Sequence, residues 1–550
     1  MSENLATIDW LVIAVYLVFL IAFAYWLSRR QESREDYYVG GRNMGAWPVA
    51  ISIMATQCST NSILGAPAFV AFAAGGGLVW LQYELAVPLA MVGLILFLIP
   101  LFRHLKLVSV YAYLEQRFDV NTRLTLSGLF LFLRAFATSV TVYSIAIVIE
   151  LITGLEFFWA VILLGAFTVV YDVMGGIRGV IYSDVIQLVI LVLVLLLILF
   201  SLLDINGGLT AMLDALEPER RRTLEFNQHG FGDGNTFAFW PMLIGGFFLY
   251  LSYYGCDQSQ VQRTLSTNGI DASNQALFLN GLLRFPLVLL YCLVGVGIGA
   301  FASQTPEFLA ALPTPNGSPE YNLAVPLYMI NNLPVGVVGL SMVALFAAAM
   351  SSLDSVLNSL SATTMEDFVR RYHDEAAGSV WSEHRELVYS RIITAIWGVI
   401  TLMMAFFVGN IASTVLEAIN QIGSMANGSI LAVFALGLLT RRAHGGGAIA
   451  GLVLGISVNA SLWVFAPLIS WLWWNVIGFV VTFAVGFIMG SLAVKPGPRS
   501  EIGKQLDPET LESSVKGYLA AEAGINWHIR SAFLVAWFAV LVVLLWLLAG

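Results

Sequence analysis

The sequence predicts an all-α integral membrane protein. Of its 550 residues, 58% are hydrophobic and only 11% are charged, whereas a soluble domain carries about 25% charged residues. Apolar runs of about 20 residues, the length that an α-helix needs to cross a bilayer, recur along the whole chain. These two observations argue against a soluble enzyme, and we expect no enzymatic activity.

Fourteen apolar segments are long enough to span the membrane. They are residues 8–27, 45–72, 78–102, 124–151, 156–174, 180–203, 237–256, 275–301, 323–364, 387–408, 411–440, 446–467, 472–493 and 529–549. The first lacks a basic flank and a cleavage site, so we interpret it as a retained helix rather than a signal peptide. The ninth is too long for one simple crossing, and we expect it to tilt or to continue into the cytoplasm.

The distribution of basic residues predicts the orientation of these helices. If the N-terminus lies outside, most of the 26 Lys and Arg residues, including Arg103, Arg263 and Arg441, fall in inner loops or at inner helix ends. Cytoplasmic loops carry such an excess of positive charge. The even number of spans then places the C-terminus outside as well. We therefore expect a multi-pass protein of the cell inner (plasma) membrane, with both termini on the outer side.

Two of the predicted spans carry polar interruptions at membrane depth. The segment "ISIMATQCSTNSILGAPAF" places hydroxyl and amide side chains in span two, and "FLYLSYYGCDQSQVQRTL" ends span seven in a similar way. Interrupted helices are tolerated in a bilayer only where they line a cavity. A pair of them indicates a transporter binding site near the midplane. The alternative is that these polar residues only join helices by hydrogen bonds.

The stretch "AAAMSSLDSVLNSLSATTMEDF" is unusually polar for a membrane helix. Ala348, Ser351, Ser352 and Ser355 recur at steps of three and four residues and therefore share one helical face. Hydroxyl and carbonyl oxygens with few carboxylates suit a monovalent hard cation better than calcium. The neighbouring Asp354 favours a functional site, because an intramembrane carboxylate is costly. The alternative is a face of small residues that only packs.

A third polar element is Asp184 in "DVMGGIRGVIYSDVIQLVILVLVLLL", at the start of a very apolar helix. Its carboxylate belongs either to an ion site or to the N-terminal end of the helix, where a negative charge is favourable. The sequence of this segment alone does not decide between the two.

Four motifs together resemble the sodium:solute symporter family. They are "YYVGGRNMGAWPVAISIMA", "GGIRGVIYSDVIQ", "DQSQVQRTLST" and "SSLDSVLNSLSATTMEDF", and they occur in collinear order. The resemblance implies a LeuT-type fold with ten core helices in a five-plus-five inverted repeat, one extra N-terminal helix and three extra C-terminal helices. It divides the chain into a leading helix and inner loop (1–44), a first repeat (45–203), an outer loop (204–236), a second repeat (237–442) and trailing helices (443–550).

The same resemblance implies the ion sites. The principal sodium site would use the backbone carbonyls of Ala55, Cys58 and Ala348 and the hydroxyls of Ser351 and Ser352. A second sodium site, present in some members, would use Asp184, Ser351, Asp354 and Ser355. Members with this site typically carry Ser or Thr where this chain has Asp354. Two close carboxylates repel, so one can be held protonated, and the position is left open between sodium and a proton.

Substrate contacts are implied by different branches of the family. The sugar-transporting branch implies Tyr83, Glu84, Tyr253 and Arg284, with Tyr250 in place of an asparagine. The sialic-acid branch implies Arg134 as the partner of a substrate carboxylate. Polar residues of the second span and of a turn on the tenth core helix complete the candidates: Gln57, Ser59, Ser62, Asn420 and Gln421. The alternative for both arginines is an ion pair with an intramembrane acid such as Glu84 or Glu150.

We therefore expect a sodium-coupled secondary active symporter that imports a small polar organic solute by alternating access. The solute class stays open among sugars, sialic acid and other organic acids, because the motifs point to different branches. The expected partners are the solute, sodium ions and the lipid bilayer, with no nucleic acid, and the oligomeric state is left open and includes a monomer. The alternatives are a proton-coupled transporter, motivated by Asp354, and a solute sensor that has the fold but does not transport.

Overall fold

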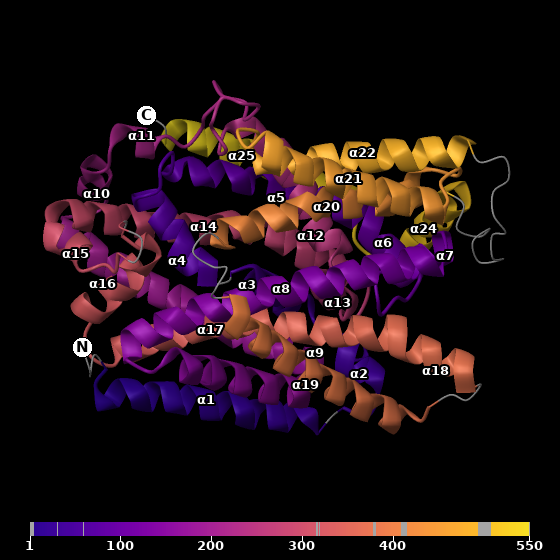
Figure 1. The fold of residues 1–550 in the computed structure, drawn as a ribbon, viewed down its shortest axis with the longest axis horizontal. Helices are drawn as coiled ribbons and strands as arrows, with labels where there is room; N and C mark the ends of the chain where they lie inside the picture. The colour runs from indigo at the N-terminus through magenta and orange to yellow at the C-terminus, as the bar shows by residue number, and fades with distance from the viewer. Residues whose placement is uncertain are drawn as a thin grey trace.

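A computed structural model describes residues 5–29, 31–58, 60–314, 317, 319–377, 381–408, 415–492 and 508–548. Within these ranges all regular elements are helices, as the sequence predicts (Figure 1). The first half contains α1 (Thr7–Ser28), α2 (Arg34–Val39), η1 (Gly40–Arg42), α3 (Ala46–Gln57), α4 (Thr60–Ala71), η2 (Leu78–Leu85), α5 (Ala86–Gly93), η3 (Leu94–Leu98), α6 (Ile99–His104), α7 (Ala112–Arg117), α8 (Val120–Thr153), α9 (Phe157–Asn206), α10 (Leu209–Ala215), α11 (Pro218–Arg221), η4 (Pro241–Gly245), α12 (Gly246–Cys256) and α13 (Gln258–Leu265).

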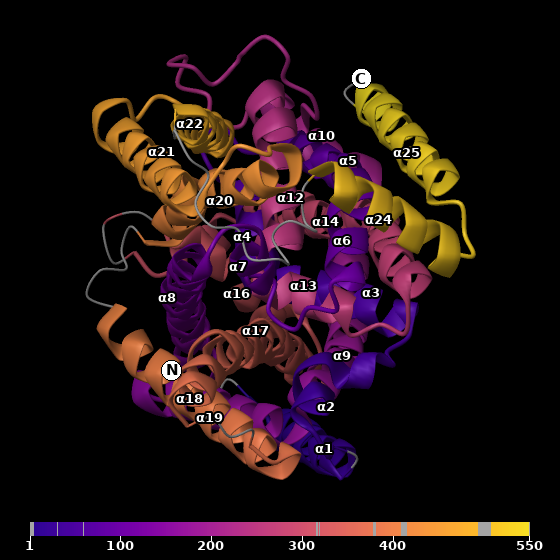
Figure 2. The same ribbon diagram turned by 90° about the vertical axis from the view of Figure 1, so that its right-hand side faces the viewer.

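The second half completes the bundle. It contains α14 (Ile270–Gln304), α15 (Pro306–Ala310), η5 (Tyr321–Leu323), α16 (Ala324–Asn332), α17 (Val337–Thr363), η6 (Thr364–Val369), α18 (Arg370–Ala377), α19 (Glu383–Val408), α20 (Val415–Leu439), α21 (Gly445–Phe465), α22 (Trp471–Leu492), α24 (Pro508–Glu522) and α25 (Trp527–Leu548). In Figure 2, α20, α21 and α22 gather on one side of the molecule, and α1 and α19 lie on the opposite side.

Eleven helices of the described chain are long and apolar enough to cross a membrane. The long helices run along one direction of the molecule (Figure 1). Large apolar side chains such as Val18, Phe132 and Phe200 stay exposed on the outer helices. Exposed apolar surface of this extent marks contact with a membrane, so the chain is a multi-pass membrane protein.

The predicted fifth and sixth spans form one element, α9, which bends at Gly176. This residue has φ 52° and ψ −160°, a conformation that glycine adopts far more readily than other residues. The bend separates the two apolar stretches that the sequence analysis treated as two spans. The broken segments α3–α4 and η4–α12 are not among the eleven long helices, so the total of fourteen spans stays a prediction.

Both predicted interruptions are present. α3 ends at Gln57, and Cys58 has a non-helical ψ of 64° before α4 begins. α12 ends at Cys256, and Asp257 is extended, with φ −91° and ψ 123°, before α13 begins. Each break releases backbone carbonyls from helical hydrogen bonds inside the protein, where they are able to bind a ligand.

The predicted ninth span, 323–364, has the wrong start. The structure divides this segment into α16 and α17, because Pro334 cannot donate a ladder hydrogen bond and Gly336 has φ 86°. The expected continuation beyond the apolar segment is confirmed at the other end, where α17 passes through the π-helical η6 into α18.

α17 lies inside the bundle (Figure 2). It packs against α1, α3, α8, α9, α13 and α19. Its serines and Asp354 are buried, apart from the half-buried Ser352, so the polar face of α17 meets other helices rather than lipid. The unusual polarity of the α17 sequence is therefore explained by side chains that lie in the interior of the protein.

Candidate functional site

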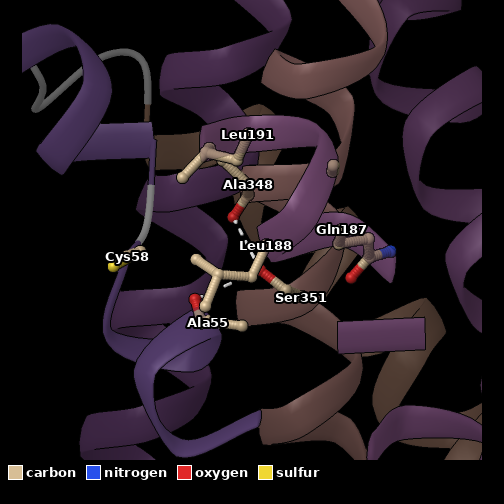
Figure 3. A pocket seen from close by; sticks show the side chains of 8 residues that line it. Ala55, Cys58, Gln187, Leu188, Leu191, Ala348 and Ser351 are labelled. Carbon is tan, nitrogen blue, oxygen red and sulfur yellow. Dashed lines mark hydrogen bonds between the residues drawn. The ribbon is translucent and has the colours of Figure 1, made fainter. Parts of the chain in front are cut away.

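The break between α3 and α4 faces the polar side of α17. Ser351 Oγ donates hydrogen bonds to the carbonyl oxygens of Ala55, at 3.4 Å, and Ala348, at 3.3 Å. Ser352 Oγ donates to the carbonyl oxygens of Ala348, at 3.2 Å, and Thr56, at 3.4 Å. Figure 3 shows Ala55, Ala348 and Ser351 turned toward one another. Packing thus unites two segments that lie 296 residues apart in the sequence.

A small cavity lies at this junction. It has a volume of about 10 Å³ and is lined by Ala55, Cys58, Gln187, Leu188, Leu191, Ala347, Ala348 and Ser351 (Figure 3). A cavity of roughly 10–15 Å³ holds one water molecule, so a single small ion also fits. The oxygens around it are neutral hydroxyls and carbonyls, which suit a hard monovalent cation. The donor set therefore fits sodium.

Gln187 is a residue of this cavity that the sequence analysis missed. Its Nε2 donates to the Tyr16 hydroxyl at 3.2 Å. Its Oε1 is buried and has no hydrogen-bond donor among the described residues. An amide oxygen of this kind adds to the oxygen ligands available to a cation. In the sequence, the one available signal was that Gln187 lies only three residues after Asp184.

Asp184, Asp354 and Ser355 lie together beside this cavity. Asp184 Oδ2 accepts a hydrogen bond from Ser52 Oγ at 2.6 Å. Ser355 Oγ lies 3.1 Å from Asp354 Oδ1, and Asp354 also accepts a hydrogen bond from the Tyr171 hydroxyl. Both carboxylates are fully buried. The predicted members of the second sodium site are thus grouped between α9 and α17.

Arg263 of α13 inserts its guanidinium into this group. It donates to Ser355 Oγ and lies 3.5 Å from Asp184 Oδ2. The sequence analysis counted Arg263 among the basic residues of inner loops and inner helix ends. Arg263 does lie in the last turn of α13, but its side chain is only 1% exposed, and the sequence analysis did not predict this burial. The side chain is buried because α13 folds back against α3 and α17 after the break at Asp257. Its position directly after an interrupted span was the only sequence signal.

A second polar group is built around Glu84 and Arg284. Arg284 Nε lies 3.2 Å from Glu84 Oε2, and Tyr250 donates to Glu84 Oε1 at 3.2 Å. The ring of Tyr83 packs at a tilt against that of Tyr250, with 4.9 Å between ring centroids. Arg284 also donates to the Cys58 thiol at 3.2 Å, so this group adjoins the break in α3.

Gln57 extends the Glu84–Arg284 group toward α12 and α14. Its side-chain oxygen accepts a hydrogen bond from Tyr254, and Tyr254 in turn lies beside Asn280. Neither amide atom of Asn280 meets the geometry of a hydrogen bond within the described chain, although the residue is fully buried. The sequence analysis missed Tyr254 and Asn280, which carry no motif of their own.

The other predicted substrate residues are more scattered. Ser62 Oγ donates to the Gln57 carbonyl at 3.4 Å. Gln421 is half-buried on α20, and no contact of its side chain joins it to the groups above. Ser59 and the side chain of Asn420 lie outside the described residues.

Arg134 forms a separate pair at the α12–α13 break. Its Nε donates to Asp257 Oδ2 at 2.5 Å, and its guanidinium lies 5.1 Å from the centroid of the Tyr253 ring. Tyr253 accepts a hydrogen bond from Gln260 at 2.8 Å. Of the two ion pairs considered from the sequence, Arg284 thus pairs with Glu84, whereas Arg134 pairs with neither Glu84 nor Glu150.

Comparison with known proteins identifies the family of this arrangement. A model of the sodium:solute symporter family matches residues 37–455. The chain belongs to this family. The matched range contains the broken helices, α17 and all of the site residues that the sequence analysis predicted, and it confirms the resemblance that the four motifs indicated.

Several sodium:solute symporters are similar over most of the chain. It is 30% identical to the sodium/sialic acid symporter NanT of Aliivibrio fischeri, over 88% of this chain and 94% of NanT. It is 29% identical to human sodium-coupled monocarboxylate transporter 1, over 83% and 73% of the two chains. The solved structure of a sodium-coupled sialic acid symporter in a substrate-bound outward-open state superposes with a TM-score of 0.79, at 24% identity, over 90% and 100%.

Membership of the family identifies the class of protein and its coupling ion. Members of the sodium:solute symporter family are transporters rather than enzymes, and sodium is the coupling ion. The chain is therefore a multi-pass sodium-coupled symporter.

Proposed function

We propose that this symporter imports a small polar organic acid, with sialic acid as the first candidate, by alternating access. The observation that carries the proposal is the meeting of the α3 break with Ser351 and Ser352 of α17, which builds a neutral oxygen site of ionic size. Half-buried Arg134 and buried Arg284 place guanidinium groups near the breaks, each able to pair with a substrate carboxylate, which favours an acid over a neutral sugar. The sialic acid relative supports the same choice.

In this proposal, sodium at Ala55, Cys58, Ala348, Ser351 and Ser352 joins the first core helix to the eighth. That link holds the substrate residues beside the α3 break in position, because Arg284 contacts the Cys58 thiol directly. Substrate binding then favours closure of the outer side, and opening to the inside separates α3 from α17 and weakens the sodium site. Coupling between two sites is reciprocal, so each ligand must tighten the binding of the other.

The remaining architecture belongs to the same proposal. Ten core helices would form the five-plus-five repeat over 45–203 and 237–442, within fourteen spans and with both termini outside an inner (plasma) membrane. The positions around Asp184, Ser351, Asp354 and Ser355 would hold a second sodium ion. The substrate site would combine Gln57, Ser59, Ser62, Tyr83, Glu84, Tyr250, Tyr253, Asn420 and Gln421 with the two arginines.

The number of sodium ions decides how steeply the solute is concentrated. One charge that moves inward across about 100 mV contributes about 2.3 kcal/mol, and a tenfold sodium gradient adds about 1.4 kcal/mol. The proposed solute carries a negative charge, and its inward movement against the same potential costs about 2.3 kcal/mol. One ion therefore supports about one decade of solute accumulation, whereas two ions support roughly three to four decades.

Uptake into proteoliposomes tests the proposal. We expect a sodium gradient, without a pH gradient, to drive accumulation of sialic acid or a short carboxylate. Uptake that needs a pH gradient and no sodium would replace this proposal with proton coupling, for which Asp354 provides the group. Sodium-dependent thermal stabilisation by a solute that is never accumulated would instead support a sensor.

A further inference from the structure

The cation position between Asp184 and Ser355 is filled by the protein's own Arg263. Besides its contacts with Ser355 and Asp184, the guanidinium donates from Nε to Ser52 Oγ at 2.8 Å and from its NH1 group to the Ser259 carbonyl. All these partners are buried. A guanidinium stays charged at physiological pH, so Arg263 supplies at this position the positive charge that a sodium ion would supply.

Asp172 is a third buried carboxylate, besides Asp184 and Asp354, within the electrostatic range of Arg263. It is fully buried, and neither of its oxygens makes a hydrogen bond of good geometry within the described chain. The amide nitrogen of Asn358, which acts on Asp172, also lacks an acceptor there. A buried carboxylate without donors is costly, and no contact described above uses it. It lies before the Gly176 bend of α9, and Asp184 lies after it.

Arg263 therefore has two carboxylates with which its guanidinium can pair, Asp184 and Asp172. Sodium and Arg263 cannot share the Asp184–Ser355 position, because like charges in a buried site repel strongly. If sodium enters, the guanidinium needs another carboxylate, since an unpaired buried charge is unfavourable. Neither oxygen of Asp172 accepts a hydrogen bond of good geometry within the described chain, while Asp184 already accepts from Ser52 and Asp354 from Tyr171.

Building on the proposed symport, we propose that Arg263 is a tethered cation that competes with sodium for the Asp184–Ser355 position, and that Asp172 accepts its guanidinium when sodium enters. The principal site is unaffected, because its donors are neutral and belong to α3 and α17. Arg263 therefore sets how many sodium ions bind. Arg263 lies on α13, directly after the α12 break. Binding of the second ion is therefore linked to the position of α13.

Equilibrium binding of radioactive sodium to the purified full chain in nanodiscs tests the competition. At a sodium concentration that saturates the principal site, we expect one ion per wild-type chain and two per Arg263→Met chain. Arg263→Lys keeps the charge and should bind one. Arg103→Met is the matched control, because Arg103 donates to the carbonyl oxygens of Leu265 and Thr267 next to α13 without touching a carboxylate. It should also bind one.

Two ions per wild-type chain under these conditions, or one per Arg263→Met chain, would overturn the competition. If Arg263→Met does not yield a monodisperse protein, Asp172→Asn provides the test. It should leave the first ion unchanged and raise at least fivefold the sodium concentration needed for the second, and an unchanged requirement would overturn the role of Asp172. If the wild type binds no sodium, or if Ser352→Ala binds sodium as tightly as the wild type, the proposed principal sodium site is contradicted instead.

Discussion

Glu84 and Arg284 form an ion pair of 3.2 Å in the interior of a membrane protein, with side chains that are only 1% and 7% exposed. The pair joins η2 to α14, and Arg284 continues to the thiol of Cys58 at the α3 break. One side chain thus connects the proposed substrate site to the proposed sodium site. The predictions below begin with this pair.

Removal of either charge should destabilise the protein, because the remaining charge stays buried without its partner. We expect Glu84→Gln and Arg284→Met each to lower the free energy of unfolding by about 3–5 kcal/mol, and the double variant to lose less than the sum. Denaturant unfolding in detergent measures this. Arg222→Met, which removes an exposed pair with Glu225, should cost at most about 1 kcal/mol. Additive losses would show that the two residues do not act as a pair.

The hydroxyl of Ser352 should contribute directly to sodium affinity. Ser352→Ala removes one neutral oxygen from the α3–α17 junction, a loss of about 1 kcal/mol, so the sodium concentration for half-maximal transport should rise about fivefold. Ser341→Ala is the matched control on the same helix, because within the described chain Ser341 Oγ donates only to its own helix, at the Val337 carbonyl. Equal sodium dependence in the two variants would move the site away from Ser352.

Arg134 should act on the solute rather than on sodium. In our proposal a substrate carboxylate takes the place of Asp257 at the guanidinium, and a charged hydrogen bond of this kind is worth about 1.5–3 kcal/mol. Arg134→Gln should therefore raise the KM for an acidic solute about 10- to 150-fold. Sodium binding by the same variant serves as the internal control and should stay unchanged. A KM equal to the wild-type value would remove Arg134 from the substrate site.

The bend in α9 should depend on Gly176. A Cβ at this position would lie 2.8 Å from the Tyr37 carbonyl oxygen, in a backbone conformation with φ 52°. Strain at such a position costs about 1–3 kcal/mol, so Gly176→Ala should lower the melting temperature. Gly179→Ala, on the same helix with no atom within 4 Å of the added Cβ, should be neutral or stabilising. Similar melting temperatures for both variants would show that the bend tolerates a side chain.

The sequence predicted the helical class and both interruptions, because these follow from local composition. A membrane helix must satisfy its own backbone groups, so polar residues in "ATQCSTNS" and "YYGCDQSQ" are visible as breaks without any knowledge of the partners. The start of the ninth span was misplaced. The apolar run continues across Pro334 and Gly336. These residues end one helix and precede the next because of their backbone conformation, which hydrophobicity does not reveal.

The burial of Arg263 could not be predicted in the same way. Its charge matched the expected excess of basic residues at inner helix ends, and only the fold of α13 against α3 and α17 places it beside Asp184. Asp172 and Asn280 were missed for a related reason. A single polar residue in an apolar helix carries no information about whether a partner faces it, and that is decided by the helices packed around it.

The sequence by itself therefore determined that the chain is a membrane bundle with two broken helices and a polar segment at 347–368, since local polarity and periodicity decide each of these properties. Tertiary structure alone decided which oxygens converge, how the buried charges pair, and that Arg263 rather than a loop faces Asp184. The physical reason is that electrostatic energy in a low-dielectric interior depends on distances between segments far apart in sequence. Those distances arise only when α3, α9, α13 and α17 pack together.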